Sequence, residues 1–197
     1  MTRSTTPSGR RIAFTLILTL ALALSSGVLA SCSSGASNSQ QPAESKSQES
    51  TGGGASTVAK KGSAAPDFEF EMIDGTTAKL SDYKGQVVLL NFWATWCGYC
   101  IREMPDMAKI TETYPDVVVL AINRGDQPAK AISGAEELGY DFVWGLDRDG
   151  AIEALYPANG IPYSVIIDKD GVVTTTFSGS AADMYPRFEQ AVVEAGA

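Results

Sequence analysis

Apolar residues gather in two nearly uninterrupted runs, at residues 86–93 and 116–123. Continuous apolar runs of this length are typical of strands in the middle of a parallel sheet, where both faces are covered. Between them, from Cys97 onward, apolar side chains recur three or four residues apart, which predicts an amphipathic helix. A strand, a helix and a second strand in this order predict a parallel crossover within an α/β sheet.

Shorter patterns on both sides of this unit extend the sheet. Residues 67–72 alternate apolar and acidic side chains before an Asp74-Gly75 turn, which predicts an N-terminal hairpin. Residues 162–168 and 172–177 flank Asp170-Gly171, which predicts a second hairpin. The sequence also predicts helices at residues 128–138, 151–156 and 181–194, and a short strand at 141–145. The expected fold is α/β, a three-layer α/β/α sandwich around a mixed central sheet with an N-terminal hairpin extension.

The N-terminal segment is not expected to join this fold. Three arginines precede the apolar residues 12–24, which is the layout of a secretory signal and too short to span a membrane comfortably. The stretch Leu29-Ala30-Ser31-Cys32 resembles a bacterial lipobox, which implies cleavage before Cys32 and lipidation of its thiol. The alternatives are a plain secretory signal with an unrelated cysteine, or an uncleaved anchor.

A long polar tract follows this signal. Residues 32–60 are rich in Ser, Gly and Gln and have almost no large apolar side chain. Such a segment cannot bury enough surface to offset the entropy lost on ordering, which predicts a flexible tether. We therefore expect a lipoprotein signal peptide at residues 1–31, the tether at 32–60 and a folded domain at 61–197.

Charge and composition exclude several classes of function. The chain has 23 acidic and 15 basic residues, and its formal charge of −8 becomes −11 without the first 31 residues, which hold three of the arginines and no acidic residue. This acidic balance argues against binding nucleic acid and against docking on anionic lipid through basic residues. The sequence contains no histidine, which excludes Cys-His and Ser-His catalysis and the usual zinc sites.

The two cysteines outside the lipobox, Cys97 and Cys100, stand between the first long strand and the helix. A structural disulfide across so short a loop would remove little chain entropy. A zinc ion needs about four ligands, so two cysteines could hold one only between two copies of the chain. A cysteine that opens a helix lies beside free N–H groups and the positive end of the helix dipole, which favour the thiolate. The pattern favours a redox-active pair, with no metal and no other cofactor.

The segment around these cysteines, NFWATWCGYC, resembles the active-site segment of the thioredoxin superfamily. The resemblance covers residues 61–197. Within the superfamily, it is closer to the extracytoplasmic TlpA/ResA-type branch, which includes the cytochrome c maturation thioredoxins. APDFEFEMIDGTTAKLSDYKGQVVLLNFWATWC is similar to the opening hairpin and first central strand of that branch, CIREMP to its helix start, and GIPYSVIIDKDG to its cis-proline strand and turn. The resemblance implies a thioredoxin-like fold and a thiol-disulfide oxidoreductase.

This resemblance also implies roles for individual residues. Cys97 matches the exposed attacking cysteine, Cys100 the resolving cysteine, and Trp96 the tryptophan that flanks the disulfide. Pro162 matches the cis-proline that faces the disulfide. The backbone of the preceding residue, Ile161, matches the segment that pairs with an extended substrate in a strand-like way.

Two features depart from ordinary thioredoxins. Asn91 replaces their buried aspartate and cannot titrate, whereas Glu103 matches a glutamate that the ResA-type branch places near the cysteine pair. Helical spacing turns Glu103 towards Cys100, where a buried carboxylate has a raised pKa and can relay a proton. The alternative is an ordinary solvated glutamate. Gly98-Tyr99 replaces Gly-Pro between the cysteines, so it tunes the reduction potential and offers the Tyr99 side chain to a partner.

Together these features predict an extracytoplasmic oxidoreductase, anchored to the outer face of the cell membrane by lipidated Cys32. Its expected partners are exported protein thiols and disulfides and a membrane electron donor or acceptor. A reducing role, as in cytochrome c maturation, is favoured over disulfide donation. The opening AxDFEF also resembles peroxiredoxins, but Ala94 stands where they need Thr or Ser. A non-catalytic binding module would not need both cysteines.

Overall fold

The computed structural model describes residues 58–197. The predictions for Cys32, for the signal peptide and for nearly all of the tether lie outside these residues. Within them, the backbone N–H of Ala59 already donates to the carbonyl of Leu155 at 2.8 Å, so contacts with the folded domain begin at its first residues. No helix in this part of the chain is long and apolar enough to cross a bilayer.

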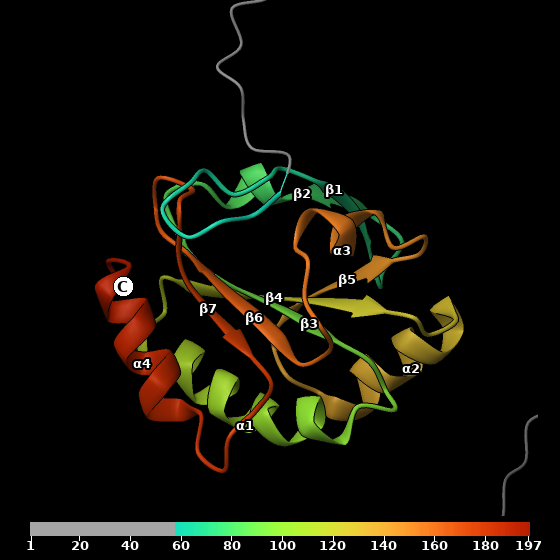
Figure 1. The fold of residues 1–197 in the computed structure, drawn as a ribbon. Coiled ribbons are helices and arrows are strands. Elements are labelled where there is room, and N and C mark those ends of the chain that lie inside the picture. The colour runs from blue at the N-terminus through green and yellow to red at the C-terminus, as the bar shows by residue number, and fades with distance from the viewer. Residues whose placement is uncertain (1–57) are drawn as a thin grey trace, which may run out of the picture. The chain divides into compact units, whose positions relative to one another are not determined.

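The described residues form a seven-stranded sheet in the order β2-β1-β5-β4-β3-β6-β7 (Figure 1). Strands β3, β4 and β5 are parallel, whereas β6 runs antiparallel to β3 and β1 runs antiparallel to β5. The two predicted hairpins form the edges, and the sheet is mixed as predicted. The strands are β1 (Glu69–Met72), β2 (Thr77–Lys79), β3 (Val87–Trp93), β4 (Val117–Arg124), β5 (Val143–Asp147), β6 (Tyr163–Ile167) and β7 (Val173–Ser178).

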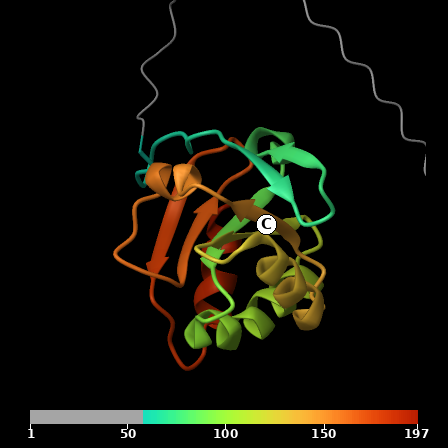
Figure 2. The same cartoon turned by 90° about the vertical axis from the view of Figure 1, so that its right-hand side faces the viewer.

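Helices cover both faces of this sheet, which confirms the three-layer prediction. Figures 1 and 2 show α1, α2 and α4 on one face and the much shorter α3 and η1 on the other. The second face is completed by the N-terminal segment, where Ala59 and Ala65 pack against the core. The helices are α1 (Gly98–Thr113), α2 (Pro128–Leu138), α3 (Ala151–Leu155), α4 (Tyr185–Glu194) and the 3₁₀ helix η1 (Leu80–Tyr83).

Strand β3 is buried along its whole length, as its continuous apolar run predicted. Alternate side chains point to opposite faces, so Leu89 and Trp93 join the core under α1 while Leu90 and Phe92 join the core under α3. Asn91 lies between Leu89 and Trp93 in this alternation. Its polar side chain is therefore buried on the α1 face, directly beneath the cysteine-bearing helix.

Most element boundaries differ from the sequence predictions by one or two residues, and two of the shifts have a clear physical reason. Helix α4 begins at Tyr185 instead of residue 181, which places Pro186 in the first turn. Backbone N–H groups of the first turn have no acceptor within the helix, so a proline there costs no hydrogen bond. Strand β5 spans Val143–Asp147 instead of residues 141–145, because Gly145 and Leu146 pair with β1 and extend the strand. Both shifts come from features that local apolar patterning does not report.

Candidate active site

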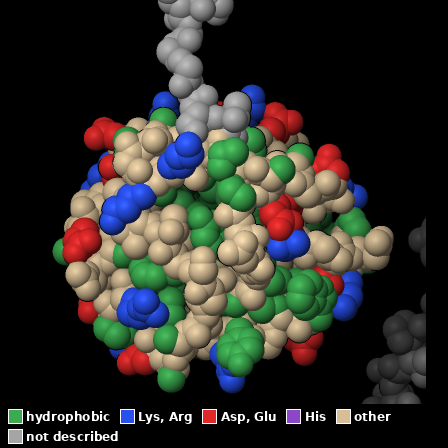
Figure 3. All heavy atoms as spheres, viewed as in Figure 1, with side chains coloured by type: hydrophobic (Ala, Val, Ile, Leu, Met, Phe, Trp, Pro, Cys, Tyr) green, Lys and Arg blue, Asp and Glu red, His purple; other side chains and the backbone are tan. Residues whose placement is uncertain are grey.

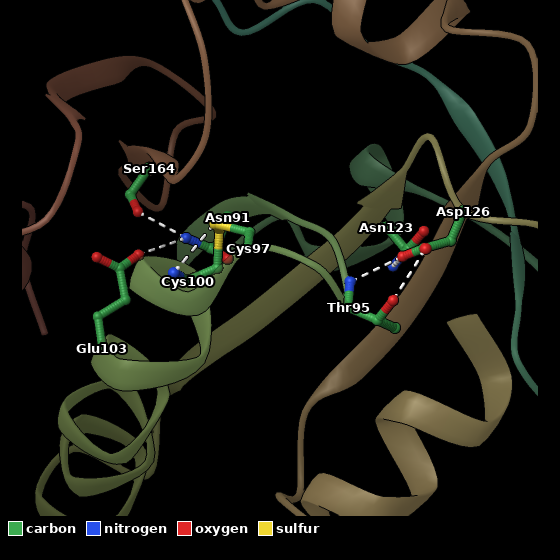
Figure 4. Close-up of a disulfide and its surroundings, with 8 residues drawn as sticks. All are labelled: Asn91, Thr95, Cys97, Cys100, Glu103, Asn123, Asp126 and Ser164. Carbon is green, nitrogen blue, oxygen red and sulfur yellow. Dashed lines mark hydrogen bonds between the residues drawn. A yellow bond between two sulfur atoms is a disulfide. The ribbon is translucent and has the colours of Figure 1, made fainter. Parts of the chain in front are cut away.

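Cys97 and Cys100 form a disulfide at the start of α1, where the carboxyl end of β3 meets the helix (Figure 4). Cys97 is the N-cap residue, and its Sγ accepts a hydrogen bond from the backbone N–H of Cys100 at 3.1 Å. This contact places Cys97 Sγ among the free N–H groups of the helix start, as predicted. Cys97 is only 6% exposed and Cys100 is fully buried, so the expectation of an exposed Cys97 is wrong for the disulfide form.

Exposed aromatic residues surround the small accessible part of the disulfide. Trp96 is 62% exposed and Tyr99 is 61% exposed, although large apolar side chains in the described domain are otherwise mostly buried. Ile161 lies across from them, and the Ile161–Pro162 peptide bond is cis, as the resemblance implied. Pro162 itself is buried and does not line the depression beside the disulfide. That depression is lined by Trp96, Cys97, Gly98, Tyr99, Arg102 and Ile161.

A buried polar cluster lies on one side of the disulfide (Figure 4). The side-chain amide of Asn91 donates to Glu103 Oε1 at 3.0 Å and to Ser164 Oγ at 2.9 Å. Asn91 and Ser164 are also direct neighbours in the β3–β6 register. Among the described residues, Asn91 Oδ1 and Glu103 Oε2 have no hydrogen-bond partner. The cluster is therefore incompletely satisfied, which is unusual for buried polar atoms and typical of a functional site.

Glu103 is buried rather than solvated, as the resemblance to the ResA-type branch implied. Burial raises the pKa of its carboxyl from 4.5 to about 7; polar groups of Ser180 and Asn91 oppose this shift, and the charge of Asp106 adds to it. A carboxyl with this pKa can both accept and release a proton near neutral pH. It comes from the same helix as Cys100, three residues further on.

A second polar cluster lies on the other side of the disulfide and includes Thr95, Asn123 and Asp126 (Figure 4). Lys130 pairs with Asp126, and we call these four residues the Asp126 cluster. Asp126 accepts from the Thr95 backbone N–H at 2.7 Å, from the Thr95 hydroxyl at 2.9 Å and from Asn123 Nδ2 at 3.1 Å. Lys130 Nζ lies 3.2 Å from its carboxylate. Burial alone raises the pKa of Asp126, but these hydrogen bonds and Lys130 outweigh it, so the pKa is lowered.

The Asp126 cluster fixes the loop that carries Trp96 and Cys97. The carboxylate of Asp126 accepts the hydrogen bond from the Thr95 backbone and so fixes the position of Thr95. The Trp96 ring lies 4.0 Å from the position that a Cβ on Gly125 would take. Gly125 has a φ of +80°, which other residues rarely adopt. On helix α2, a Cβ added to Gly134 would come within 2.6 Å of the Thr95 side chain, so that helix packs tightly against the same loop.

Sequence analysis missed Ser164, Arg102 and the Asp126 cluster. One signal was available for Asp126, since it follows a long buried strand expected beside the strand that leads to Cys97. Carboxyl ends of parallel strands meet at one edge of a sheet, where functional residues gather. Ser164 gave no such signal, because its approach to Asn91 depends on the antiparallel register of β6.

We expect Asp126→Asn to destabilise the oxidised protein by about 2 kcal/mol, because asparagine offers one acceptor oxygen where the carboxylate offers two. Its NH₂ group would also face the donors of Thr95 and Asn123. The free energy of unfolding from urea titration measures the effect. Asp74→Asn is a matched control in an exposed turn, where the carboxylate accepts only from Thr76. Equal stability of Asp126→Asn and the wild type would contradict an anchoring role.

Comparison with known proteins agrees with this architecture. Residues 61–176, more than half of the chain, match the AhpC/TSA family. The chain therefore belongs to this family of thioredoxin-like proteins.

Several curated relatives are named thiol-disulfide oxidoreductases. The chain is 36% identical over 126 residues to the thiol-disulfide oxidoreductase ResA of Geobacillus thermodenitrificans, covering 63% of this chain and 72% of the relative. A Chlorobium tepidum structure described as a thiol:disulfide interchange protein DsbE superposes with a TM-score of 0.66 at 32% identity, covering 70% and 99% of the two chains. The exposed lipoprotein thioredoxin of Streptococcus pneumoniae has a TM-score of 0.55 at 32% identity, covering 65% and 96%. With its disulfide at the helix start, this protein is an oxidoreductase of the thioredoxin-like type.

Proposed function

We propose that this protein is a membrane-anchored, extracytoplasmic thiol-disulfide oxidoreductase that reduces disulfides of exported proteins through Cys97 and Cys100. The observation that carries the proposal is the disulfide at the N-terminus of α1 with the buried carboxyl of Glu103, pKa about 7, one helical turn away. The name of the ResA relative supports the chemistry. Apocytochrome c, whose cysteines must be reduced before haem attachment, is the substrate type we favour.

The reaction begins with the reduced pair. The Cys97 thiolate attacks one sulfur of a substrate disulfide, which forms a mixed disulfide and releases one substrate thiolate. The Cys100 thiolate then attacks the Cys97 sulfur, releases the second substrate thiolate and re-forms the Cys97–Cys100 disulfide. Two electrons pass to the substrate, and a membrane donor returns two electrons to the pair. In this proposal Glu103 accepts the Cys100 proton before the second attack and returns it on reduction.

Substrate binding is assigned to the surface around the disulfide. The rings of Trp96 and Tyr99 offer exposed apolar area beside Cys97. Gly98 also lines the depression, and the space beside it is open, because a Cβ there would meet no atom within 4 Å beyond its chain neighbours and its own helix backbone. We propose that the backbone at Ile161 pairs with an extended substrate segment and that Pro162 fixes that backbone.

Localisation rests on the N-terminal sequence. We propose that lipidated Cys32 anchors the protein to the outer face of the membrane and that the tether lets the domain reach its partners. The name of the pneumococcal relative, an exposed lipoprotein thioredoxin, supports this location. The lipid chains stay in the bilayer while the domain acts in the extracytoplasmic space.

The reduction potential of the Cys97–Cys100 pair tests the proposed direction. We expect about −270 mV or lower from equilibration with a dithiothreitol or glutathione couple, a range in which the dithiol reduces other proteins. A value towards about −120 mV would contradict a reductase and favour the alternative, an oxidant that donates disulfides to exported chains.

A further inference from the structure

Two shallow depressions meet beside the disulfide, and both include Tyr99 and Arg102. The first is the depression next to Cys97, and the second is lined by Tyr99, Arg102, Ser180, Ala181 and Ala182. Arg102 is the only charged residue that lines either of these depressions in the described domain. A substrate segment that reaches Cys97 therefore meets one charged side chain at this surface, and it is a cation.

The positive charge of Arg102 is held in place and remains available. Its guanidinium carbon lies 4.2 Å from the centroid of the Tyr99 ring, a cation–π contact that orients the side chain without neutralising it. Arg102 is exposed and makes no ion pair with another residue of the described domain. A planar guanidinium fixed in this way can bind a carboxylate with two parallel hydrogen bonds.

The surroundings make this cation distinctive. Four other basic residues of the described domain, Lys79, Arg124, Lys130 and Arg148, are each paired with a carboxylate, and the remaining basic residues without an ion pair line neither depression, so position beside the disulfide sets Arg102 apart. Figure 3 shows charges of both signs scattered over the face of the molecule that it draws, as expected of a chain with 23 acidic and 15 basic residues. An unpaired cation beside the reactive sulfur of an acidic protein attracts a negatively charged segment and repels a positively charged one.

We propose that Arg102 selects substrates with an aspartate or glutamate close to the reactive cysteine, within about three residues in an extended segment. This inference rests on the proposed function, since it names the segments that the Cys97–Cys100 pair prefers. A substrate cysteine at Cys97 places its flanking residues over the Tyr99 and Arg102 side chains. The carboxylate then binds the guanidinium as the cysteine sulfur meets Cys97.

Three peptides test the proposal. Each carries one cysteine as a mixed disulfide with glutathione and has Asp, Asn or Lys two residues from it. The reduced full chain in detergent gives up two electrons and two protons to the mixed disulfide, which becomes two thiols as the Cys97–Cys100 disulfide forms. We expect the Asp peptide to react about fivefold faster than the Lys peptide, with the Asn peptide between them. Tryptophan fluorescence in a stopped-flow instrument follows the rate.

Variants assign the preference to Arg102. Arg102→Gln is expected to bring the three rates within about 1.5-fold of one another, and Arg102→Glu to reverse their order. The Asp-to-Lys ratio cancels any effect of Arg102 on the reactivity of Cys97 itself. Lys109→Gln is the matched control, because Lys109 lies on the same helix as Arg102 but lines neither depression. Like Arg102, Lys109 makes a cation–π contact, with its Nζ 3.8 Å from the centroid of the Tyr185 ring. Lys109→Gln is expected to keep the wild-type ratio.

The outcomes separate this inference from the proposed function. Exchange with all three peptides at equal rates, or the same ratio in wild type and Arg102→Gln, would overturn the role of Arg102 and leave the oxidoreductase proposal standing. Failure to exchange with any peptide would overturn both.

Discussion

Replacing Cys100 with serine is expected to abolish turnover, lowering disulfide reductase activity by at least about a hundredfold, and to trap the substrate on Cys97. Cys97 can still attack a substrate disulfide, but no neighbouring thiol is left to resolve the mixed disulfide. Cys100 is fully buried, one helical turn from Cys97, and its sulfur is bonded to Cys97 in the oxidised protein. Non-reducing electrophoresis and mass spectrometry of the trapped complex measure the effect.

Cys97→Ser provides the control for this experiment. It removes the attacking sulfur, so neither turnover nor a trapped complex is expected. Turnover retained in either variant would show that the pair is not the catalytic centre and would favour a non-catalytic binding module. A trapped complex formed by Cys97→Ser rather than by Cys100→Ser would reverse the two assigned roles.

The second large effect concerns stability and pH at Glu103. The carboxyl has a pKa of about 7 in the folded protein against an ordinary 4.5, with burial as the main cause, so the folded state binds more protons than the unfolded state between these values. Stability is therefore expected to fall as pH rises from about 4.5 to 7 and to level off above, with a loss on the order of 3 kcal/mol. Glu103→Gln should not show this fall and should be the more stable protein at pH 7.5.

Urea titrations of the oxidised protein at several pH values measure this dependence, since the cysteines cannot titrate in a disulfide. The sequence has no histidine, so no side chain that ordinarily titrates between pH 5 and 7 adds its own pH dependence to the measured stability. Glu112→Gln is a suitable control, because Glu112 is exposed on the same helix. Parallel stability curves for wild type and Glu103→Gln across this range would rule out a buried, titrating Glu103.

Most of the fold could be predicted from the sequence because its signals are local. The continuous apolar run that became β3 requires cover on both faces, and the Asp170-Gly171 turn requires a hairpin, whatever the rest of the chain does. The boundaries of β5 and α4 were wrong because they depend on pairing with β1 and on Pro186 in the first helical turn. Pairing with β1 is a tertiary effect, whereas Pro186 is a local signal for a helix start that apolar periodicity does not report.

The active site divides in the same way. Cys97, Cys100 and Glu103 follow one another along one helix, so spacing and resemblance together placed all three. The exposure of Cys97 was misjudged because the burial of this residue in the disulfide form depends on tertiary packing that spacing does not report. The anchoring of Thr95 by Asp126 joins residues 31 positions apart, and the Asn91–Ser164 contact spans 73 positions.

These long separations have a consequence for biosynthesis. Cys97 and Cys100 leave the ribosome before Asp126 and well before Ser164, so the growing chain carries two thiols without the polar clusters that flank them in the finished domain. A disulfide closed at that stage would lack the environment that defines the site. Cys32 is the only other cysteine in the chain, so mispairing within one molecule is limited to that residue, and lipidation of its thiol would remove even this competitor.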